Sequence, residues 1–412
     1  MILFLHNRYR TTGGEERVVQ DLLRLVPERL GESAELLARD SSPARLAAGR
    51  GLLWGGLGAG EVSAAVRLTG ARIVHAHNLQ PTLGWRALAA ARAQGARVVL
   101  HLHQYRLVCA VGVCYTGGRE CTRCHGRNTL PGVIHGGRGS RPEALAYAAA
   151  LALWQRRIVD QADAIVVPSA FARERLHELG APLPWERVHV LAPPVWGEGH
   201  REREGKGQRV GEGEVVGEGE GEGEGERERA GVEWVPRSIG SYALLVSRLS
   251  PEKGIDVAID ACAKAGIALV IAGDGPQRES LQALAGDHVR FVGRVGDHRL
   301  AELRAGATLA LVPSRSAETF GLAAAEAMTA GLPVIASRIG ALPELVGEEE
   351  LVPPGDASAL AGAIDRLRAD PDAGERARER AQSACAPAVV AHKLTAIYDA
   401  AAAPASHTLP RR

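Results

Sequence analysis

One segment in the last third of the chain constrains the fold more than any other, because it has the pattern strand, loop, helix, turn, strand. The apolar residues Thr308–Val312 predict a short buried strand, and the Ala-rich stretch Gly321–Ala330 predicts a helix. Gly331 stands where a helix C′ residue belongs, and Pro333 prevents the helix from continuing. A second strand is expected at Val334–Ala336. The segment is therefore a βαβ unit of a parallel sheet.

Two carboxylates lie on this unit at positions where an α/β fold binds ligands. Glu318 is on the loop at the carboxyl end of the first strand, and Glu326 is on the helix. Ligands of open α/β sheets bind at the carboxyl ends of the strands. The helix begins at Phe320, Gly321 and Leu322, where free N–H groups and the positive end of the dipole suit a phosphate. The segment therefore predicts a site that holds a diphosphate on backbone groups and binds hydroxyls with both acids.

Strands and helices alternate along the rest of the chain as well. Expected strands are Ile2–Leu5, Ala34–Leu37, Arg72–His75, Arg97–Leu102, Ala164–Val167, Val188–Leu191, Tyr242–Ser247, Ile267–Ala272, Val289–Val292 and Leu309–Val312. Expected helices are Glu15–Leu25, Leu83–Gln94, Glu143–Val159, Ala170–Leu179, Ile255–Ala265, Arg278–Ala285, Asp297–Ala305, Ala357–Arg368 and Ala388–Ala402. Alternation at this period predicts an α/β fold with two Rossmann-like, doubly wound parallel-sheet domains.

A stretch rich in glycine and glutamate divides the chain. Residues 211–226 consist of seven Gly, seven Glu and two Val, which cannot form a core. We expect a disordered, self-repelling linker there, either an expanded hinge, because loop length costs little stability, or a recruitment tail. The expected organisation is a first domain over 1–196, the linker over 197–236, a second domain over 237–385, a helix over 386–403 that crosses back to the first domain, and a loose tail over 404–412.

Composition and charge favour a soluble enzyme over a membrane or nucleic-acid protein. The 412 residues suffice for two to three domains with their own cores. No apolar run reaches the roughly 18 residues that a membrane span needs. The start of the chain reads as a strand rather than a signal peptide, so we expect a cytoplasmic protein. Outside residues 197–231, 43 Lys and Arg stand against 37 Asp and Glu. This mild excess suits an anionic donor or membrane surface and is far below what nucleic-acid binding needs.

The spacing Glu318-x7-Glu326, with Phe320-Gly321 inside it and Gly331-Leu-Pro-Val334 after it, resembles the donor-site motif of retaining family 4 glycosyltransferases. The resemblance implies the GT-B architecture, in which two Rossmann-like domains face each other across a cleft. It implies transfer of a hexose-type sugar from a nucleotide-diphosphate sugar to a hydroxyl acceptor with retention of the anomeric configuration. Glu326 would then accept hydrogen bonds from the ribose hydroxyls, and Glu318 would lie beside the transferred sugar as a catalytic residue. The carboxylate pair of a glycosidase is excluded, because those acids must flank the scissile bond from separate walls of a cleft.

Two cations are expected at the carboxyl end of the second domain's first strand. The run Ser247-Arg-Leu-Ser-Pro-Glu-Lys-Gly254 follows a buried strand and opens a helix, so Arg248 and Lys253 can meet the two phosphates of a donor. Fixed cations stabilise the charge that grows on the leaving diphosphate. The resemblance therefore implies that no divalent metal is needed. Two further residues match the family's donor site, Gly273 in the loop after one strand and Val295 after another.

The first domain offers a glycine pair and a histidine to the same cleft. Gly13 and Gly14 directly follow the first strand region and allow a close backbone approach to phosphate or sugar, and they match the family's Gly-Gly-x-Glu motif. His103 ends another strand, and the resemblance places it beside the donor sugar as a catalytic residue. His77 and His101 are expected to be packing or acceptor residues.

Four of the six cysteines form a cluster with the spacing Cys109-x4-Cys114-x6-Cys121-x2-Cys124. A Cys-x2-Cys knuckle with further thiols nearby has the ligand spacing of tetrahedral zinc. The readings that remain open are a structural zinc site, reduced thiols in a loop and a regulatory disulfide, whereas a catalytic metal is not expected. The remaining Cys262 and Cys385 are expected to be core or surface residues.

The expected partners are a nucleotide-diphosphate sugar and a hydroxyl acceptor, which lipid-linked glycans among others could supply. The stretch Leu145–Trp154, flanked by Arg156 and Arg157, could rest on the inner face of a membrane or could be an ordinary buried helix. Two other functions stay open at this point. One is a nucleotide-sugar epimerase of the same architecture, and the other is a zinc-binding regulatory protein with an inert transferase domain.

Overall fold

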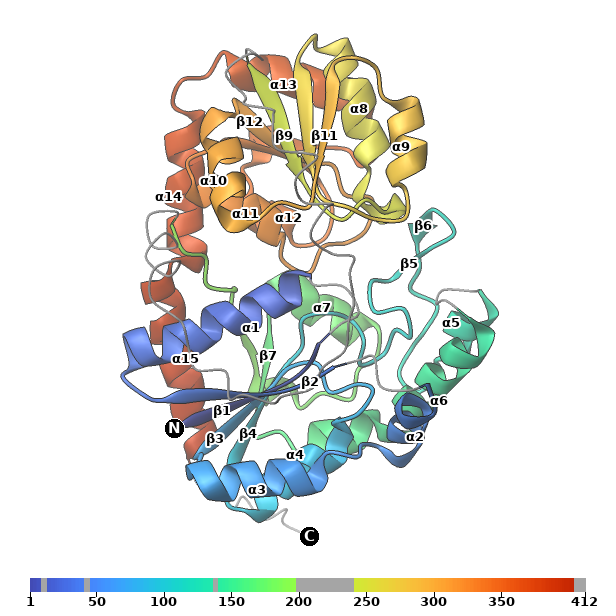
Figure 1. The fold of residues 1–412 in the computed structure, drawn as a ribbon, viewed down its shortest axis with the longest axis vertical. Coiled ribbons are helices and arrows are strands. Elements are labelled where there is room, and N and C mark those ends of the chain that lie inside the picture. The colour runs from blue at the N-terminus through green and yellow to red at the C-terminus, as the bar shows by residue number, and fades with distance from the viewer. Residues whose placement is uncertain (9–12, 41–44, 136–139, 198–240, 404–412) are drawn as a thin grey trace, which may run out of the picture.

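The structure is a computed structural model that describes residues 1–8, 13–40, 45–135, 140–197 and 241–403. Two parallel sheets of six strands each form two domains, which lie one above the other in Figure 1. The prediction of an α/β fold with two parallel sheets is confirmed. Most of the predicted linker over 197–236, and the predicted tail over 404–412, lie outside the described residues.

The first sheet has the strand order β2-β1-β3-β4-β7-β8. Its strands are β1 (Ile2–Arg8), β2 (Ala34–Asp40), β3 (Ile73–Ala76), β4 (Arg97–His101), β7 (Ala164–Val167) and β8 (Val188–Val190). Its helices are α1 (Gly14–Leu25), α2 (Arg45–Trp54), α3 (Ala59–Thr69), α4 (Gly84–Ala93), α5 (Leu130–Ile134), α6 (Arg141–Asp160) and α7 (Ala170–Glu178). The chain winds outward from β1 in one direction and then returns to β3 in the other. This reversal creates a crevice at the carboxyl ends of β1 and β3, where α/β folds bind ligands.

The second sheet has the strand order β11-β10-β9-β12-β13-β14 and reverses between β9 and β12. Its strands are β9 (Tyr242–Val246), β10 (Ala268–Ala272), β11 (Val289–Gly293), β12 (Leu309–Val312), β13 (Val334–Ser337) and β14 (Leu351–Val352). Its helices are α8 (Ile255–Lys264), α9 (Arg278–Leu284), α10 (Asp297–Gly306), α11 (Leu322–Thr329), α12 (Leu342–Leu345), α13 (Ala357–Arg368) and α14 (Ala373–Cys385). The predicted cation loop follows β9 and the predicted carboxylate loop follows β12. Both therefore lie at the reversal point of this sheet.

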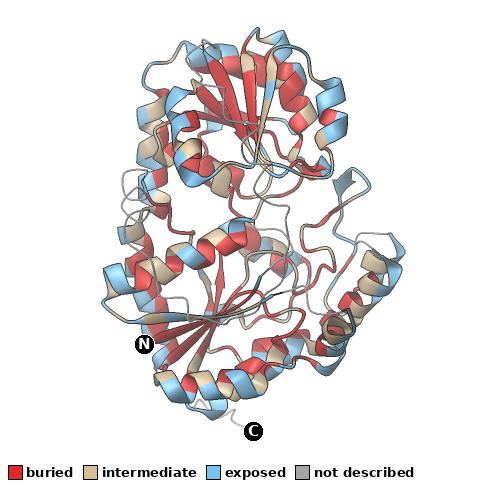
Figure 2. Cartoon of the chain, in the orientation of Figure 1, coloured by how far each residue is buried: buried red, intermediate tan, exposed pale blue. Residues whose placement is uncertain are grey.

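The inner strands of each sheet are buried on both faces, as Figure 2 shows by the red strands between helices whose outer sides are exposed. Neighbouring residues of a strand point to opposite faces, so Ile2 and Phe4 of β1 pack in one core and Leu3 and Leu5 pack in the other. Because both faces are covered, these strands consist of nearly continuous apolar residues rather than alternating ones. This explains why the apolar runs of the sequence located them within three residues.

The last helix, α15 (Pro387–Ala402), follows the second domain in sequence but packs on the first (Figure 1). Its buried face, which includes Leu394 and Tyr398, completes the core formed by β1, β3, β4 and α1. The hydroxyl of Tyr398 lies 2.8 Å from Nδ1 of His75 on β3. The first domain is therefore built from both ends of the described chain.

Several elements were not expected from the sequence. Helices α2 and α3 and the short strand β14 lacked a clear apolar period, and α14 is an Arg- and Glu-rich helix that buries only a narrow alanine stripe. Between β4 and α6 lies a hairpin of two-residue strands, β5 (Tyr115–Thr116) and β6 (Arg119–Glu120). Runs of two residues carry no periodicity, so pattern analysis does not detect them.

Candidate functional site

The candidate site lies between the two sheets, where residues from the carboxyl ends of their strands meet. Thr319, on the loop between β12 and α11, donates its hydroxyl to the backbone carbonyl of His103 at 2.9 Å. The carbonyl of Thr319 accepts a hydrogen bond from the hydroxyl of Ser169, which caps α7, at 2.7 Å. These bonds place the carboxylate loop of the second domain directly against the histidine end of β4.

Glu318 is held in this loop by two neighbours. Nζ of Lys253 lies 2.7 Å from its Oε1, and the hydroxyl of Ser314 donates to the same oxygen at 2.6 Å. Burial alone would raise the pKa of Glu318, but the Lys253 ammonium and the Ser314 hydroxyl hold that pKa below its usual range. The predicted catalytic acid and one predicted donor-binding cation are therefore brought together as an ion pair.

Arg248, the other predicted cation, lies on the same turn but makes a different contact. Its guanidinium binds the carboxylate of Glu252, which also accepts the hydroxyl of Ser250 at 2.6 Å. The Arg248 side chain is still 57% exposed, so it is free to reorient. Lys253 ends the short helical turn Pro251–Lys253, and Gly254 follows with φ 64°, which leaves the backbone close to the Pro313 carbonyl.

Glu326 lies in α11 and is enclosed by two guanidinium groups. Arg304 of α10 approaches one of its oxygens at 2.5 Å, and Nε of Arg17 approaches the other at 2.6 Å. Arg17 belongs to α1 of the first domain and also contacts Asp297 of α10 at 3.0 Å. Burial would lower the pKa of Arg17, but Glu326 and Asp297 raise it. The acid predicted to bind a ribose is thus the centre of an ion-pair cluster that joins the two domains.

The glycines predicted to approach the donor stand at the start of α1. Gly13 is the N-cap of this helix, and its N–H donates to the carboxylate of Glu16 at 2.9 Å. A Cβ atom at Gly14 would lie 3.4 Å from the Leu322 side chain at the start of α11. The first turns of α1 and α11 therefore face each other across the domain boundary, and both present backbone N–H groups to the cleft.

The remaining predicted residues of the second domain keep the strand ends close together. A Cβ atom at Gly273 would lie 1.8 Å from the carbonyl oxygen of Ser247, so only glycine fits between β9 and β10. Gly321 has φ 98°, where a Cβ would lie 2.6 Å from Leu342. Phe320 is buried in the core beside α11, and Val295 packs at the edge of the same core.

Four neighbouring histidines, His75, His77, His101 and His103, extend from the core of the first domain into the cleft. His75 and His77 follow one another on the same face of β3 and its extension, and His101 and His103 do so at the end of β4. Nε2 of His75 lies 3.2 Å from Nδ1 of His101, and Nδ1 of His77 lies 2.7 Å from Nε2 of His103. The His77 and His103 rings are stacked at 16° with centroids 5.0 Å apart. His103 is therefore held from within the domain by His77.

Burial makes all four imidazoles neutral. Desolvation lowers the pKa of His75 and of His103 to about 3, with a smaller contribution from neighbouring histidines, and it lowers the pKa values of His77 and His101 well below the usual range. Ligand nitrogens of three of them, His75, His77 and His101, lie within 4.8 Å of one another. Metal ligation needs lone pairs that converge on one point. The His75 and His77 rings stack at 19°, so their in-plane lone pairs run nearly parallel, and the arrangement fits a hydrogen-bonded stack better than a metal centre.

The four clustered cysteines lie in the segment between His103 and α6, apart from the groups described above. Three parts of the site were not expected from the sequence at all. Arg17 and Arg304 bind Glu326, and Thr319 binds the strand end of His103. A signal was available only for Arg17, which directly follows the glycine and glutamate motif of the first domain.

Comparison with known proteins agrees with this geometry. Residues 236–384 match the family model described as glycosyl transferases group 1, and residues 4–194 match that of the glycosyl transferase 4-like domain. The first domain is therefore a glycosyl transferase 4-like domain, and the second is a glycosyl transferases group 1 domain. The two matched ranges coincide with the two sheets.

Curated relatives match over part of their length. The phosphatidyl-myo-inositol mannosyltransferase of Mycobacterium leprae is 36% identical over 141 residues, which are 31% of this chain and 37% of that protein. The D-inositol 3-phosphate glycosyltransferase of Acidothermus cellulolyticus is 40% identical over 151 residues, which are 31% of this chain and 33% of that protein. The chain thus spans about a third of the length of these relatives.

Solved structures agree over nearly the whole fold. Anabaena HepE in complex with UDP-glucose has a TM-score of 0.60 at 18% identity, with 97% of this chain and 99% of that chain covered. The sucrose-phosphate synthase of Thermosynechococcus elongatus has a TM-score of 0.62 at 21% identity, with 97% of this chain and 98% of that chain covered. The fold of the chain is therefore GT-B, as the sequence resemblance implied.

The four neighbouring histidines predict how the free energy of unfolding depends on pH. Below a pH of about 6.5 the unfolded chain binds protons at these imidazoles that the folded chain does not bind, so their contribution to stability is present above that pH and is lost as the pH falls. Each histidine should lower the free energy of unfolding by up to about 1.4 kcal/mol per pH unit. We expect His75→Asn to reduce the slope between pH 6.5 and about 4.5 by roughly one proton, as measured by urea unfolding. His298→Asn, on an exposed helix position, is the matched control. Equal slopes in the wild type and in His75→Asn would contradict the assignment.

Proposed function

We propose that this protein transfers a sugar from a nucleotide-diphosphate sugar to a hydroxyl acceptor and retains the anomeric configuration. The observation that carries the proposal is the grouping of Lys253, Glu318 and His103 around one loop. Lys253 and Glu318 are in contact, and the residue after Glu318 is hydrogen-bonded to the backbone of His103. A cation suited to phosphate, a carboxylate suited to sugar hydroxyls and a neutral imidazole from the opposite domain thus converge where the carboxyl ends of the two sheets meet.

The diphosphate of the donor would lie at the carboxyl end of β9, beside Arg248 and Lys253. Both cations are paired with carboxylates, so a donor would compete with Glu252 and Glu318 for them. Arg248 can bind a phosphate bidentately, and Lys253 acts as a point charge. The N–H groups at the start of α11 add a fixed dipole. Because this positive charge stabilises the leaving diphosphate more than the bound donor, we propose that transfer needs no divalent metal.

The ribose of the donor would bind Glu326. The Glu326 carboxylate is shared between Arg304 within the domain and Arg17 from the opposite domain. Ribose hydroxyls would take the place of the Arg17 contact, whereas Arg304 is almost fully buried and would keep the carboxylate oriented. Donor binding would then release Arg17 at the edge of the nucleotide site.

The contacts of Glu318 and His103 support the proposal of retention. The Glu318 carboxylate is occupied by Lys253 and Ser314, which suits it to hold sugar hydroxyls rather than to attack the anomeric carbon. His103 is neutral and binds His77 through Nε2, so a hydroxyl of the sugar or acceptor would meet Nδ1. We therefore assign attack by the acceptor on the same face from which the diphosphate leaves. The leaving phosphate oxygen takes the acceptor proton.

Substitution of the diphosphate cation tests the donor site. We expect Lys253→Met to lower kcat by two or more orders of magnitude, about 3 kcal/mol of transition-state stabilisation. Glu326→Gln should weaken donor binding, which is measured by the melting shift with UDP-, GDP- and ADP-hexoses. Lys393→Met on the exposed side of α15 is the matched control. Near-normal turnover of Lys253→Met, or conversion of the donor sugar without any acceptor, would contradict the proposal.

Chelation tests the independence from divalent metals. We expect transfer to persist in excess EDTA, because the cations of the cleft neutralise the diphosphate directly. Assays with and without EDTA, followed by addition of magnesium, manganese or zinc, measure this. Restoration by magnesium or manganese at an unchanged melting temperature would overturn the metal-free mechanism. Restoration by zinc alone, together with a lowered melting temperature in EDTA, would locate the effect in the protein's stability.

We further propose that the first domain rests on an anionic lipid surface while it acts on its acceptor. Helices α2 and α5 both pack against α6, and the three lie together at the lower right of Figure 1. Exposed large apolar side chains on them are Leu53, Trp54, Leu130, Ile134, Leu145 and Leu153. Exposed arginines on or beside them are Arg50, Arg127, Arg141, Arg156 and Arg157. Exposed apolar side chains together with arginines on the same helices are complementary to anionic headgroups. None of the helices in the described ranges has the length and apolar character needed to cross a membrane.

Vesicle sedimentation tests this contact. We expect binding to phosphatidylglycerol vesicles, weaker binding to phosphatidylcholine vesicles, and loss of most binding in Leu53→Ser/Trp54→Ser because these side chains enter the interface. Leu284→Ser removes a leucine of similar exposure from α9 of the second domain and is the control. Absence of binding to phosphatidylglycerol, or equal binding of the double variant, would refute the membrane contact.

A further inference from the structure

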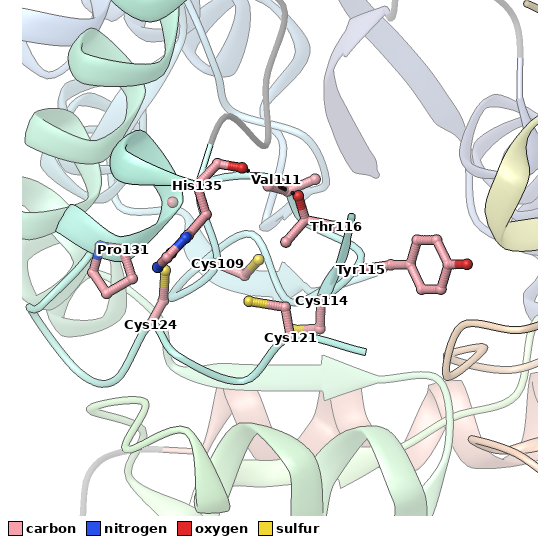
Figure 3. A pocket seen from close by; sticks show the side chains of 10 residues that line it. Cys109, Val111, Cys114, Tyr115, Thr116, Cys121, Cys124, Pro131 and His135 are labelled. Atoms are coloured by element: carbon pink, nitrogen blue, oxygen red, sulfur yellow. Dashed lines mark hydrogen bonds between the residues drawn. The ribbon is translucent and has the colours of Figure 1, made fainter. Parts of the chain in front are cut away.

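Four cysteines from separate parts of one irregular segment line a single pocket in the first domain. Cys109, Cys114, Cys121 and Cys124 surround it together with His135, and all four cysteines are free thiols (Figure 3). Three of them are buried, and Cys121 is partly exposed. Buried thiols are common singly, but four that share one small pocket are ligands suited to a soft or borderline cation.

Two of the sulfurs already make contacts with the residues around the pocket. The thiol of Cys124 donates to the backbone carbonyl of Thr129 at 3.8 Å. The guanidinium of Arg123 lies 3.9 Å from Sγ of Cys121, so a cationic side chain is at hand to offset the charge of several thiolates.

Little else holds this segment in place. Between the end of β4 and the start of α6 the described residues form only the two-residue strands of the β5–β6 hairpin and the five-residue helix α5. Cys114 has φ 50° and is the one residue other than glycine with a positive φ among the residues that the structure describes. A left-handed conformation at a residue with a Cβ costs about 1–2 kcal/mol, so something must favour the position that it gives to this thiol. Short irregular segments of this kind are often cross-linked by a disulfide or a metal.

We propose that Cys109, Cys114, Cys121 and Cys124 bind one structural zinc ion that cross-links the segment. The ion would take four thiolates, and the four thiol protons would pass to solvent. Cys121 and Cys124 form the Cys-x2-Cys half of the site, and Cys109 and Cys114 form the other half. The four sulfurs are spread more widely than around a bound ion, since the one group with ligand atoms within 4.8 Å among the described residues is that of the histidines. Zinc binding would draw the loop inward. This movement would cost little free energy, because the loop has little regular structure to break.

A zinc ion at this site would affect the cleft by fixing the position of the segment, and it would take no part in the reaction. The cross-linked segment begins directly after His103, and the N–H of Tyr105 donates to the Gly112 carbonyl at 3.0 Å. On the other side of the hairpin, Figure 3 shows Tyr115 pointing away from the sulfurs. Its hydroxyl lies close enough to Arg315 and Glu252 of the second domain to interact with them electrostatically. A zinc ion would therefore hold this hairpin as a wall of the cleft, whatever reaction the cleft performs.

Metal analysis of the whole chain tests the proposal. We expect protein purified without chelators to contain one equivalent of zinc per chain by elemental mass spectrometry, and Cys121→Ser and Cys124→Ser to contain less than a tenth of that. Cys385→Ala removes a thiol from the second domain and should retain the zinc. Cys114→Ser should lose zinc, whereas His135→Ala should keep it. Full zinc in Cys114→Ser together with loss in His135→Ala would overturn the tetrathiolate set.

Two measurements on the wild type avoid any variant that fails to fold. Cobalt(II) should replace the zinc and give the sulfur-to-metal charge-transfer absorption of a tetrahedral thiolate site. Removal of the metal should lower the melting temperature and increase proteolytic cleavage within residues 102–135. Less than a tenth of an equivalent of zinc with no cobalt charge-transfer band would refute the proposal. So would a Cys109–Cys114 disulfide in protein purified without reductant.

Discussion

The ion pairs of one buried carboxylate, that of Glu326, fix the position of the two domains relative to each other. Glu326 is almost fully buried, and a buried charge is tolerated only where opposite charges and hydrogen bonds surround it. Arg304 meets this need from within the second domain, and Arg17 meets it from the first. Loss of one partner from such a buried cluster typically costs about 3–5 kcal/mol, because the remaining charge is left uncompensated. Any ligand that takes over part of the Glu326 carboxylate therefore changes what holds the domains together.

A second contact between the domains also pairs a carboxylate with positive partners, but these partners are backbone N–H groups rather than guanidinium groups. The Glu344 carboxylate of α12 accepts the N–H groups of Ala170 and Phe171, at 3.0 and 2.6 Å, and so caps the start of α7 in the first domain. A carboxylate at a helix N-terminus is favoured by the dipole, but it is exposed here and screened by solvent. Opening of the cleft must break both, and the Arg17 contact is the more costly one.

The sequence could predict the sheets and the second-domain half of the site because both depend on short-range patterns. Apolar runs identify strands that are buried on both faces, and Lys253 and Glu318 lie in the segments that follow two such strands. Arg17 could not be assigned, since it meets Glu326 only after two domains are placed in space. Arg304 is 22 residues from Glu326 in the sequence, but their contact depends on how α10 and α11 are placed within the second domain. His77 was expected to be a packing or acceptor residue, and its hydrogen bond to His103 depends on the register of β3 with β4. The roles of all these residues toward a donor remain proposals.

The two walls of the cleft are stiffened by different means, and the reason lies in their secondary structure. In the second domain the loops after β9 and β12 are short and are tied by charges, with Arg315 binding Asp256 bidentately at 2.8 and 2.6 Å and Lys253 binding Glu318. The wall of the first domain is formed instead by the segment between β4 and α6, whose described residues 102–135 have hardly any regular structure. Surface ion pairs contribute little to ordering such a length of chain. A cross-link among its four cysteines would supply the missing constraint, and it would do so directly beside the histidine that faces the carboxylate loop.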